Sequence, residues 1–163
     1  MAGARLAIRR GTARDLPVIL ALIRGLAKYE RLAHQMEATP ARLRRHGFGR
    51  RPYFETLICR RGRTPVGFAL YFYTYSTFLG RPSLYLEDLF VLPEERGRGA
   101  GKALLRALAK IATARGCGRM EWTVLDWNAP AIRFYKRIGA RLHSEWVLTR
   151  LKGAPLERLA RSR

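Results

Sequence analysis

The sequence is poor in cysteine, in acidic residues and in long apolar runs, and each shortage excludes a class of protein. Its two cysteines, Cys59 and Cys117, form neither a CxxC pair nor a metal-binding spacing, and we interpret both as small buried hydrophobic residues. The longest apolar run covers residues 68–75 and includes Thr74, whereas a membrane span needs about 20 residues. The first residues lack the apolar stretch of a signal peptide. We therefore expect a cytoplasmic protein with no membrane segment and no metal site.

The length and composition are those of one folded domain. The chain has 163 residues, of which 48% are hydrophobic and 27% are charged, as in ordinary globular proteins. No Gly/Ser/Pro linker and no internal repeat interrupts it. We predict one domain over residues 1–151 followed by a basic C-terminal tail over residues 152–163.

The charge is the unusual property of the chain. Its 32 Lys and Arg residues outnumber 12 Asp and Glu residues, which makes the net charge +20. Such a charge attracts nucleic acid without specificity. The arginines are dispersed along the chain, and no zinc finger or RNP-type aromatic run accompanies them. We interpret the excess as an Arg-rich surface, and a nucleic-acid-binding module remains the alternative from another functional class.

Hydrophobic periodicity predicts an α/β (α+β) domain with a mixed, mostly antiparallel sheet. The expected order is β-α-α-β-β-β-α-β-α-β, because an antiparallel meander passes into a β-α-β crossover. Thr12 and Thr39 begin the first two helices, and Asn128 begins the last. The expected strands cover residues 4–10, 53–60, 65–75, 83–91, 119–126 and 141–151, and the third helix covers 101–115.

A glycine-rich turn, residues 96–101, separates a strand from that third helix. Glycines let backbone N–H groups approach a ligand closely, and a helix N-terminus attracts anions. The turn lacks the Gly and Ser/Thr positions of a Walker loop and the third glycine of a dinucleotide-binding fingerprint. The pattern therefore indicates a phosphate cradle of another type.

Two motifs, one of which contains this cradle, resemble those of a known protein family. The pattern Arg96-x-x-Gly99-x-Gly101 resembles the acetyl-CoA pyrophosphate loop of the GNAT N-acetyltransferase superfamily. The segment from Asn128 to Gly139 resembles the second motif of that superfamily, with Pro130, Ala131 and Tyr135 in place. The chain is most similar to the spermidine/spermine (diamine) N-acetyltransferases, which include thialysine acetyltransferase-like members. That resemblance is carried by residues 27–30, 47–49, 85–88 and 127–130.

The resemblance implies acetyl-CoA as cosubstrate and a GNAT fold with helices on both faces of the sheet. It places the cofactor against strand and loop residues whose backbone would contact the pantetheine arm and the pyrophosphate. These are Leu89, Phe90, Val91, Arg96, Gly97, Arg98, Gly99, Ala100, Gly101, Lys102, Asn128, Pro130, Ala131 and Tyr135. Family members are typically homodimers that share the last strand and the C-terminal segment, so we expect a homodimer.

The resemblance also assigns the chemistry. Tyr135 is the expected general acid, because a phenol is protonated at neutral pH and can donate to a departing thiolate. Glu87 is the expected base, or the residue that positions a water for that purpose. Glu87 and Asp88 are adjacent in an apolar strand, and alternation would let only one of them face the pocket. The substrate pocket would be lined by Tyr29, Glu30, Asp88, Glu121, Glu145 and Trp146.

The sequence is compatible with more than one amine as acceptor of the acetyl group. A di- or polyamine fits an acid-lined pocket, although a surface charge of +20 repels a polycation. A lysine analogue such as thialysine carries its own carboxylate and is repelled less. A protein lysine or an antibiotic amine is the alternative on the same fold.

Overall fold

The computed structural model describes residues 5–162. These residues divide between Thr123 and Val124 into two units. The first contains all the strands and the helices that pack on them, and the second contains two short helices.

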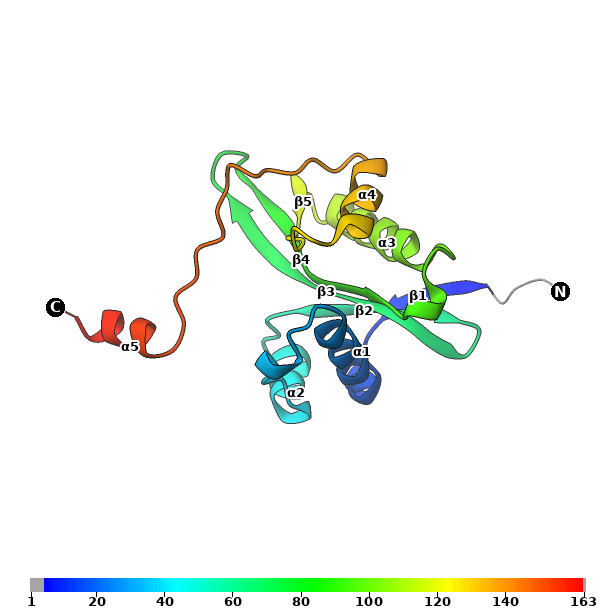
Figure 1. Cartoon of the computed structure of the whole chain (residues 1–163), viewed down its shortest axis with the longest axis horizontal. Coiled ribbons are helices and arrows are strands. Elements are labelled where there is room, and N and C mark those ends of the chain that lie inside the picture. Colours follow the sequence, from blue (N-terminus) through cyan, green and yellow to red (C-terminus); the bar gives the residue numbers. More distant parts are fainter. Residues whose placement is uncertain (1–4, 163) are drawn as a thin grey trace. The chain divides into compact units, whose positions relative to one another are not determined.

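The first unit is built on a five-stranded sheet in the order β1-β2-β3-β4-β5 (Figure 1). The first three pairs are antiparallel and β4 pairs with β5 in parallel, which confirms the expected mixed sheet. The hairpin between β2 and β3, part of the expected antiparallel meander, turns at Gly62, whose φ is 58°. The strands are β1 (Leu6–Arg10), β2 (Glu55–Arg61), β3 (Thr64–Ser76), β4 (Arg81–Val91) and β5 (Arg119–Glu121).

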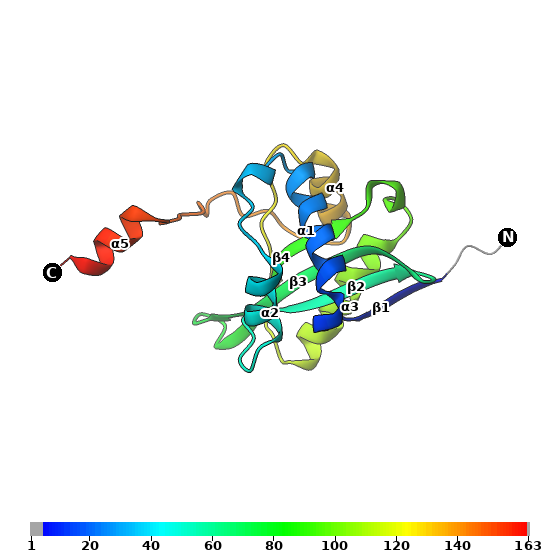
Figure 2. The ribbon, with the colours of Figure 1, turned by 90° about the horizontal axis from the view of Figure 1, so that it is seen from below.

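Helices cover both faces of this sheet (Figures 1 and 2). Helices α1 (Leu16–Tyr29) and α2 (Pro40–Phe48) lie on one face, and α3 (Ala100–Ala114) lies on the other. Helices α1 and α3 bury an apolar stripe, because leucine and isoleucine recur in them at helical spacing, whereas α2 buries Leu43 alone. Leu22 of α1 packs with Phe68, Leu70 and Phe90 of the sheet.

Gly25 brings the end of α1 close to β4. A Cβ atom at Gly25 would lie 2.7 Å from the ring of Phe90, so only glycine permits this approach. Tyr29 packs against the same cluster. The close contact holds Tyr29 and the following Glu30 on the face of β4.

A carboxylate anchors the start of α1. Thr12, the residue expected to begin this helix, pairs with Asp15, whose carboxylate accepts hydrogen bonds from Thr12 N at 2.8 Å and from Thr12 Oγ1 at 2.9 Å. Arg9 of β1 adds two further bonds, at 2.8 and 2.5 Å. These contacts hold the pKa of Asp15 well below its usual range, chiefly through Arg9.

Replacing Asp15 by Asn is expected to destabilise the fold by about 1–3 kcal/mol at pH 7, because a buried charged partner is lost. A depressed carboxyl pKa stabilises the fold above the unfolded-state pKa of about 4, and the benefit disappears as the pH falls below it. The difference from the wild type, measured by urea unfolding, should therefore shrink between pH 7 and pH 3. The exposed pair of Glu157 and Arg161 supplies the control, and Glu157→Gln should cost less than about 0.5 kcal/mol.

The second unit contains α4 (Ala129–Arg137) and α5 (Ala154–Arg161). Asn128 is the N-cap of α4, as predicted, and its Oδ1 accepts a hydrogen bond from Ala131 N at 3.4 Å. The expected C-terminal tail forms the two turns of α5, and its last residue, Arg163, lies outside the described residues.

Two strand predictions near the C-terminus are wrong. The strand expected over residues 119–126 ends at Glu121, and residues 141–151 form no strand within the described part of the chain. Strand β5 follows β4 only from Ser83 to Tyr85, and the ladder between β3 and β4 has a bulge shortly after, at Glu87. Residues 141–151 have alternating side chains typical of a strand, but a strand also needs a neighbour for its backbone groups.

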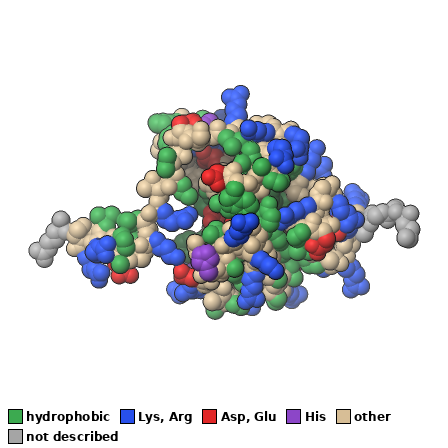
Figure 3. Space-filling model, in the orientation of Figure 1, with side chains coloured by type: hydrophobic (Ala, Val, Ile, Leu, Met, Phe, Trp, Pro, Cys, Tyr) green, Lys and Arg blue, Asp and Glu red, His purple; other side chains and the backbone are tan. Residues whose placement is uncertain are grey.

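Basic side chains are spread over the surface and acidic ones are few, as Figure 3 shows for one face. This distribution agrees with the dispersed arginines of the sequence. Within residues 5–162 no helix is both long and apolar enough to span a bilayer.

Candidate active site

Strand β4 carries the predicted acidic pair at a bulge. Leu70 of β3 lies opposite Asp88 and Tyr71 lies opposite Leu86, so Glu87 has no partner across the ladder. A bulge breaks the regular alternation of side chains. Strict alternation, on which the expected separation of the two carboxylates rests, therefore does not hold at this position.

The carboxylates of Glu87 and Glu30 act on that of Asp88 beside this bulge. Burial, together with the negative charges of Glu87 and Glu30, raises the pKa of Asp88 to about 7. Burial also raises the pKa of Glu30 at the end of α1. Glu87 itself is exposed, whereas Asp88 and Glu30 are partly buried. The cluster can bind a cation and can hold or release a proton near neutral pH.

The strand next to this cluster has an open edge. Strand β5 pairs with β4 only over Ser83–Tyr85, and no other strand within residues 5–162 pairs with that edge. Leu92 N donates to Val66 O of β3 at 2.9 Å. Backbone groups alternate along an antiparallel strand, so those of Val91 and Leu89 face the open edge and those of Phe90 face β3. The open edge can therefore pair with the amides of an extended ligand.

The loop after β4 is held by side chains. Arg96 Nε donates to Val91 O at 3.1 Å, and its guanidinium lies over the ring of Tyr29, 4.2 Å from the ring centre. Glu95 binds Arg61 at 2.7 Å and Arg98 at 2.8 Å. The sequence analysis did not identify Glu95. Its position beside a basic loop, in a chain with few acids, was the feature that could have indicated its role.

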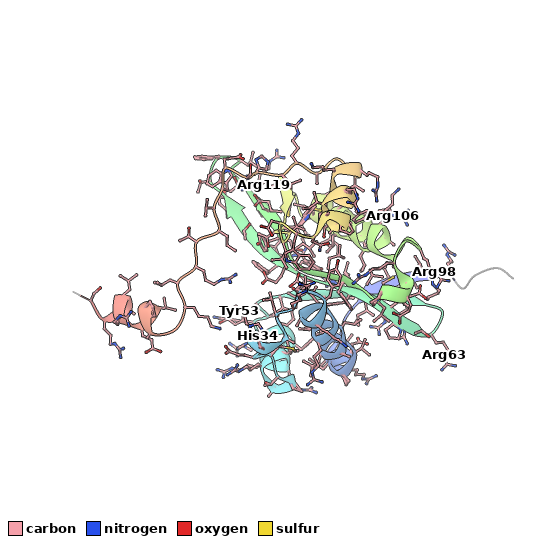
Figure 4. The ribbon with its side chains drawn as sticks, in the orientation of Figure 1. His34, Tyr53, Arg63, Arg98, Arg106 and Arg119 are labelled. Atoms are coloured by element: carbon pink, nitrogen blue, oxygen red, sulfur yellow. The ribbon has the colours of Figure 1, made fainter. Side chains whose placement is uncertain are left out.

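The N-terminus of α3 is open to an anion. Gly99 is its N-cap at φ 89°, with no side chain capping the helix, and Gly97 has φ 71°. The first intrahelical bond runs from Ala103 N to Gly99 O. The N–H groups of residues 100–102 therefore lack helical partners and can bind phosphate oxygens. Figure 4 shows Arg98 in the loop that precedes them.

The remaining predicted site residues lie elsewhere. Glu121 is on β5 and pairs with Arg119 at 3.1 Å. In the second unit, Tyr135 is partly buried on α4 and Trp146 is 76% exposed. Glu145 is exposed and binds His143 at 2.9 Å, which lowers the pKa of its carboxyl. The first unit thus brings together Tyr29, Glu30, Glu87, Asp88 and the loop over residues 96–102.

No three His, Cys, Asp or Glu residues within 5–162 converge as a metal site would require.

Comparison with known proteins identifies close relatives. The model of the acetyltransferase (GNAT) family matches residues 20–140. A thialysine N-epsilon-acetyltransferase of Mus musculus is 37% identical, over 94% of this chain and 96% of its own. An L-ornithine N5-acetyltransferase of Arabidopsis thaliana is 32% identical, over 92% of this chain and 86% of its own. An integron cassette protein from the mobile metagenome of V. cholerae has a similar structure, with a TM-score of 0.80, 29% identity and coverage of 98% and 100%.

Proposed function

This chain belongs to the GNAT acetyltransferase family and is an N-acetyltransferase, and from that premise we propose that it transfers the acetyl group of acetyl-CoA directly to the primary amine of a small molecule. The observation that carries the proposal is the carboxylate cluster of Glu30, Glu87 and Asp88. It lies directly before the open segment of β4, so a bound ammonium group and an extended acyl donor would meet there.

The donor fits the residues that would hold it. Acetyl-CoA supplies a reactive thioester, an extended arm with two amides and a pyrophosphate. Leu89 and Val91 offer backbone groups to the arm, and the N–H groups from Gly97 to Lys102 offer donors to the pyrophosphate. Arg96 is held on Val91 and Tyr29, so it would brace the loop beside a bound pyrophosphate. Asn128, with Pro130 and Ala131, would contact the cofactor from the start of α4.

The acidic pair would remove the acceptor's proton. An alkylammonium with a pKa near 10.4 is neutral in roughly one molecule in 2,500 at pH 7. Removing its proton at that pH therefore costs about 4.6 kcal/mol. Glu87 is exposed and would take the proton directly or through a water. Asp88, with a pKa of about 7, would share it. Tyr135 would hold its phenolic proton and donate it to the departing thiolate.

An amino acid with a second amine is the acceptor that we favour. The two relatives described above are named for thialysine and L-ornithine. Such a substrate carries its own carboxylate, so the +20 charge of this chain slows its approach less than that of a polyamine. A di- or polyamine is the second candidate, because three carboxylates can hold two ammonium groups. Tyr29, Glu121, Glu145 and Trp146 would complete the pocket.

A homodimer in the cytoplasm is part of the same proposal. Residues 141–151 have the alternating pattern of a strand without a neighbouring strand, and Trp146, Val147 and Leu148 are 76%, 83% and 67% exposed. A second copy of the chain would give this segment a partner. Sedimentation or light scattering with and without residues 141–163 tests the dimer.

Release of CoA from acetyl-CoA tests the function. The acceptors to compare are thialysine, lysine, ornithine, putrescine, spermidine, an aminoglycoside and a histone-tail peptide, each at two salt concentrations. Turnover is expected with a small amine, highest for a lysine analogue. Turnover with the aminoglycoside or the peptide alone would reassign the acceptor class, and tight DNA binding unaffected by acetyl-CoA would favour the nucleic-acid alternative.

Replacing Gly99 by Ala is expected to raise the KM for acetyl-CoA by about tenfold, because a residue with a Cβ atom resists its φ of 89° and displaces the N–H groups. Gly116→Ala is the matched control, since Gly116 has φ 67° at the other end of α3. Both variants should lose stability, and only the first should change the KM. An equal KM change in both would contradict the proposed cradle.

A further inference from the structure

A groove with a volume of about 450 Å³ lies between β1 and α3. Leu6 and Ile8 of β1 line it on one side, and the small side chains of Ala103 and Ala107 line it on α3. Strand β1 is separated from β4 by β2 and β3 in the sheet order, so the groove is not part of the open edge of β4. It shares Gly99 and Lys102 with the phosphate loop, whereas the rest of its lining has no part in the proposed acetyl transfer.

A stripe of positive charge borders the groove. Lys102, Arg106 and Lys110 are exposed residues of α3 that line it, and Figure 4 shows Arg106 among them. Their spacing of four residues places them on one face, about 6 Å apart along the helix axis. None of the three forms an ion pair with an acid in the described part of the chain, and no acid lines the groove. The stripe therefore lacks a negative partner within residues 5–162.

The strand that borders the groove is an edge strand. Among residues 5–162, strand β1 pairs with β2 alone, so its second edge presents backbone donors and acceptors there. Exposed Arg9 and Arg10 lie at the end of this strand and are paired with Asp15 and Glu55. A second copy of this chain would bring mainly basic residues to this edge, because only 12 of its 163 residues are acidic, so the dimer proposed above is expected to use residues 141–151 instead.

We propose that the groove binds an extended acidic segment of another protein, which adds a strand to β1 and places alternate carboxylates against α3. Alternate residues of a strand lie about 6.7 Å apart, close to the 6 Å spacing of the basic stripe. The methylene groups of glutamates would cover Leu6 and Ile8. Single-stranded nucleic acid fits less well, because no aromatic side chain lines the groove for base stacking.

Two labelled peptides of equal composition test this proposal in the full-length protein. The first alternates glutamate and valine over eight residues, and the second carries four glutamates followed by four valines. Fluorescence anisotropy at physiological salt should show about tenfold tighter binding of the alternating peptide, since only it matches the stripe. Hydrogen exchange should slow in β1 when that peptide binds.

Arg106→Glu with Lys110→Glu should weaken binding of the alternating peptide by about tenfold or more. The matched control is Arg44→Glu with Arg45→Glu, the same charge change on exposed residues of α2, and it should change binding less than threefold. Acetyl transfer to a small amine should persist in both variants. If the reversed pair fails to fold, Arg106→Gln with Lys110→Gln replaces it, with a smaller loss expected.

Equal binding of the two peptides, or an equal loss in the α2 variant, would show attraction to the overall charge alone and overturn the proposal. Tighter binding of an oligo(dT) strand that is lost in the Arg106 and Lys110 variant would assign the groove to nucleic acid, and would also overturn it.

Discussion

Replacing Tyr135 by Phe is expected to lower kcat by about 10²-fold or more, because the departing thiolate loses its proton donor. The substitution removes only the phenolic oxygen, and the ring stays beside Phe134, whose ring centre lies 5.6 Å away. The KM for acetyl-CoA should change little, since the lost interaction belongs to the transition state. Steady-state kinetics with thialysine, or with the best acceptor found, provides the measurement.

Tyr75→Phe is the matched control for this prediction. Tyr75 is 66% exposed on β3 and has no role in the proposed site. Its loss of a phenol should leave kcat unchanged. If Tyr135→Phe also keeps kcat within about threefold of the wild type, Tyr135 is not the acid, and the second motif would serve cofactor binding alone.

Replacing Asp88 by Asn is expected to lower kcat/KM by about 10²-fold at pH 8 and to abolish an inflection near pH 7. The wild-type carboxyl has a pKa of about 7 because it is partly buried beside Glu87 and Glu30. Its ionised fraction therefore increases about tenfold between pH 6 and pH 8. The ratio of wild-type to variant activity should rise by roughly that factor. The pH dependence of kcat/KM measures it.

Stability separates this catalytic effect from a structural one. A carboxyl pKa raised by folding means that the native state binds more protons than the unfolded state between about pH 4 and pH 7, so stability falls as the pH rises through that window. The variant lacks this penalty and should melt at the same temperature as the wild type, or higher, at pH 8. A lower melting temperature with an unchanged inflection would contradict the assignment.

Glu87→Gln distinguishes the two acids. Its negative charge raises the pKa of Asp88, so its removal should move the inflection to lower pH and reduce activity without abolishing the inflection. If Glu87→Gln abolishes the inflection and Asp88→Asn only shifts it, the inflection near pH 7 does not belong to Asp88, and the proposed role of Asp88 in sharing the proton is wrong.

Local chemistry made the fold and the motifs readable from the sequence. Caps such as Thr12, Thr39 and Asn128, and the glycines of residues 97–101, act over three or four residues, so their pattern alone located the helices and the phosphate loop. The strands between residues 53 and 91 were predicted because the alternation of apolar and polar side chains is also a local pattern. The prediction of a last strand was wrong. Residues 141–151 have the side-chain pattern of a strand, but a strand forms only where its backbone groups pair with a neighbouring strand.

The sequence by itself determined the family, the order of elements up to α4, and the residues from which the site is built. Only the tertiary structure decided how those residues act on one another in the first unit. The bulge at Glu87, the approach of α1 at Gly25 and the contact of Arg96 with Tyr29 each join segments distant in the chain. The raised pKa of Asp88 follows from burial and from the charge on Glu30, 58 positions earlier in the sequence. Burial and electrostatic coupling depend on distance in space, which sequence spacing does not encode.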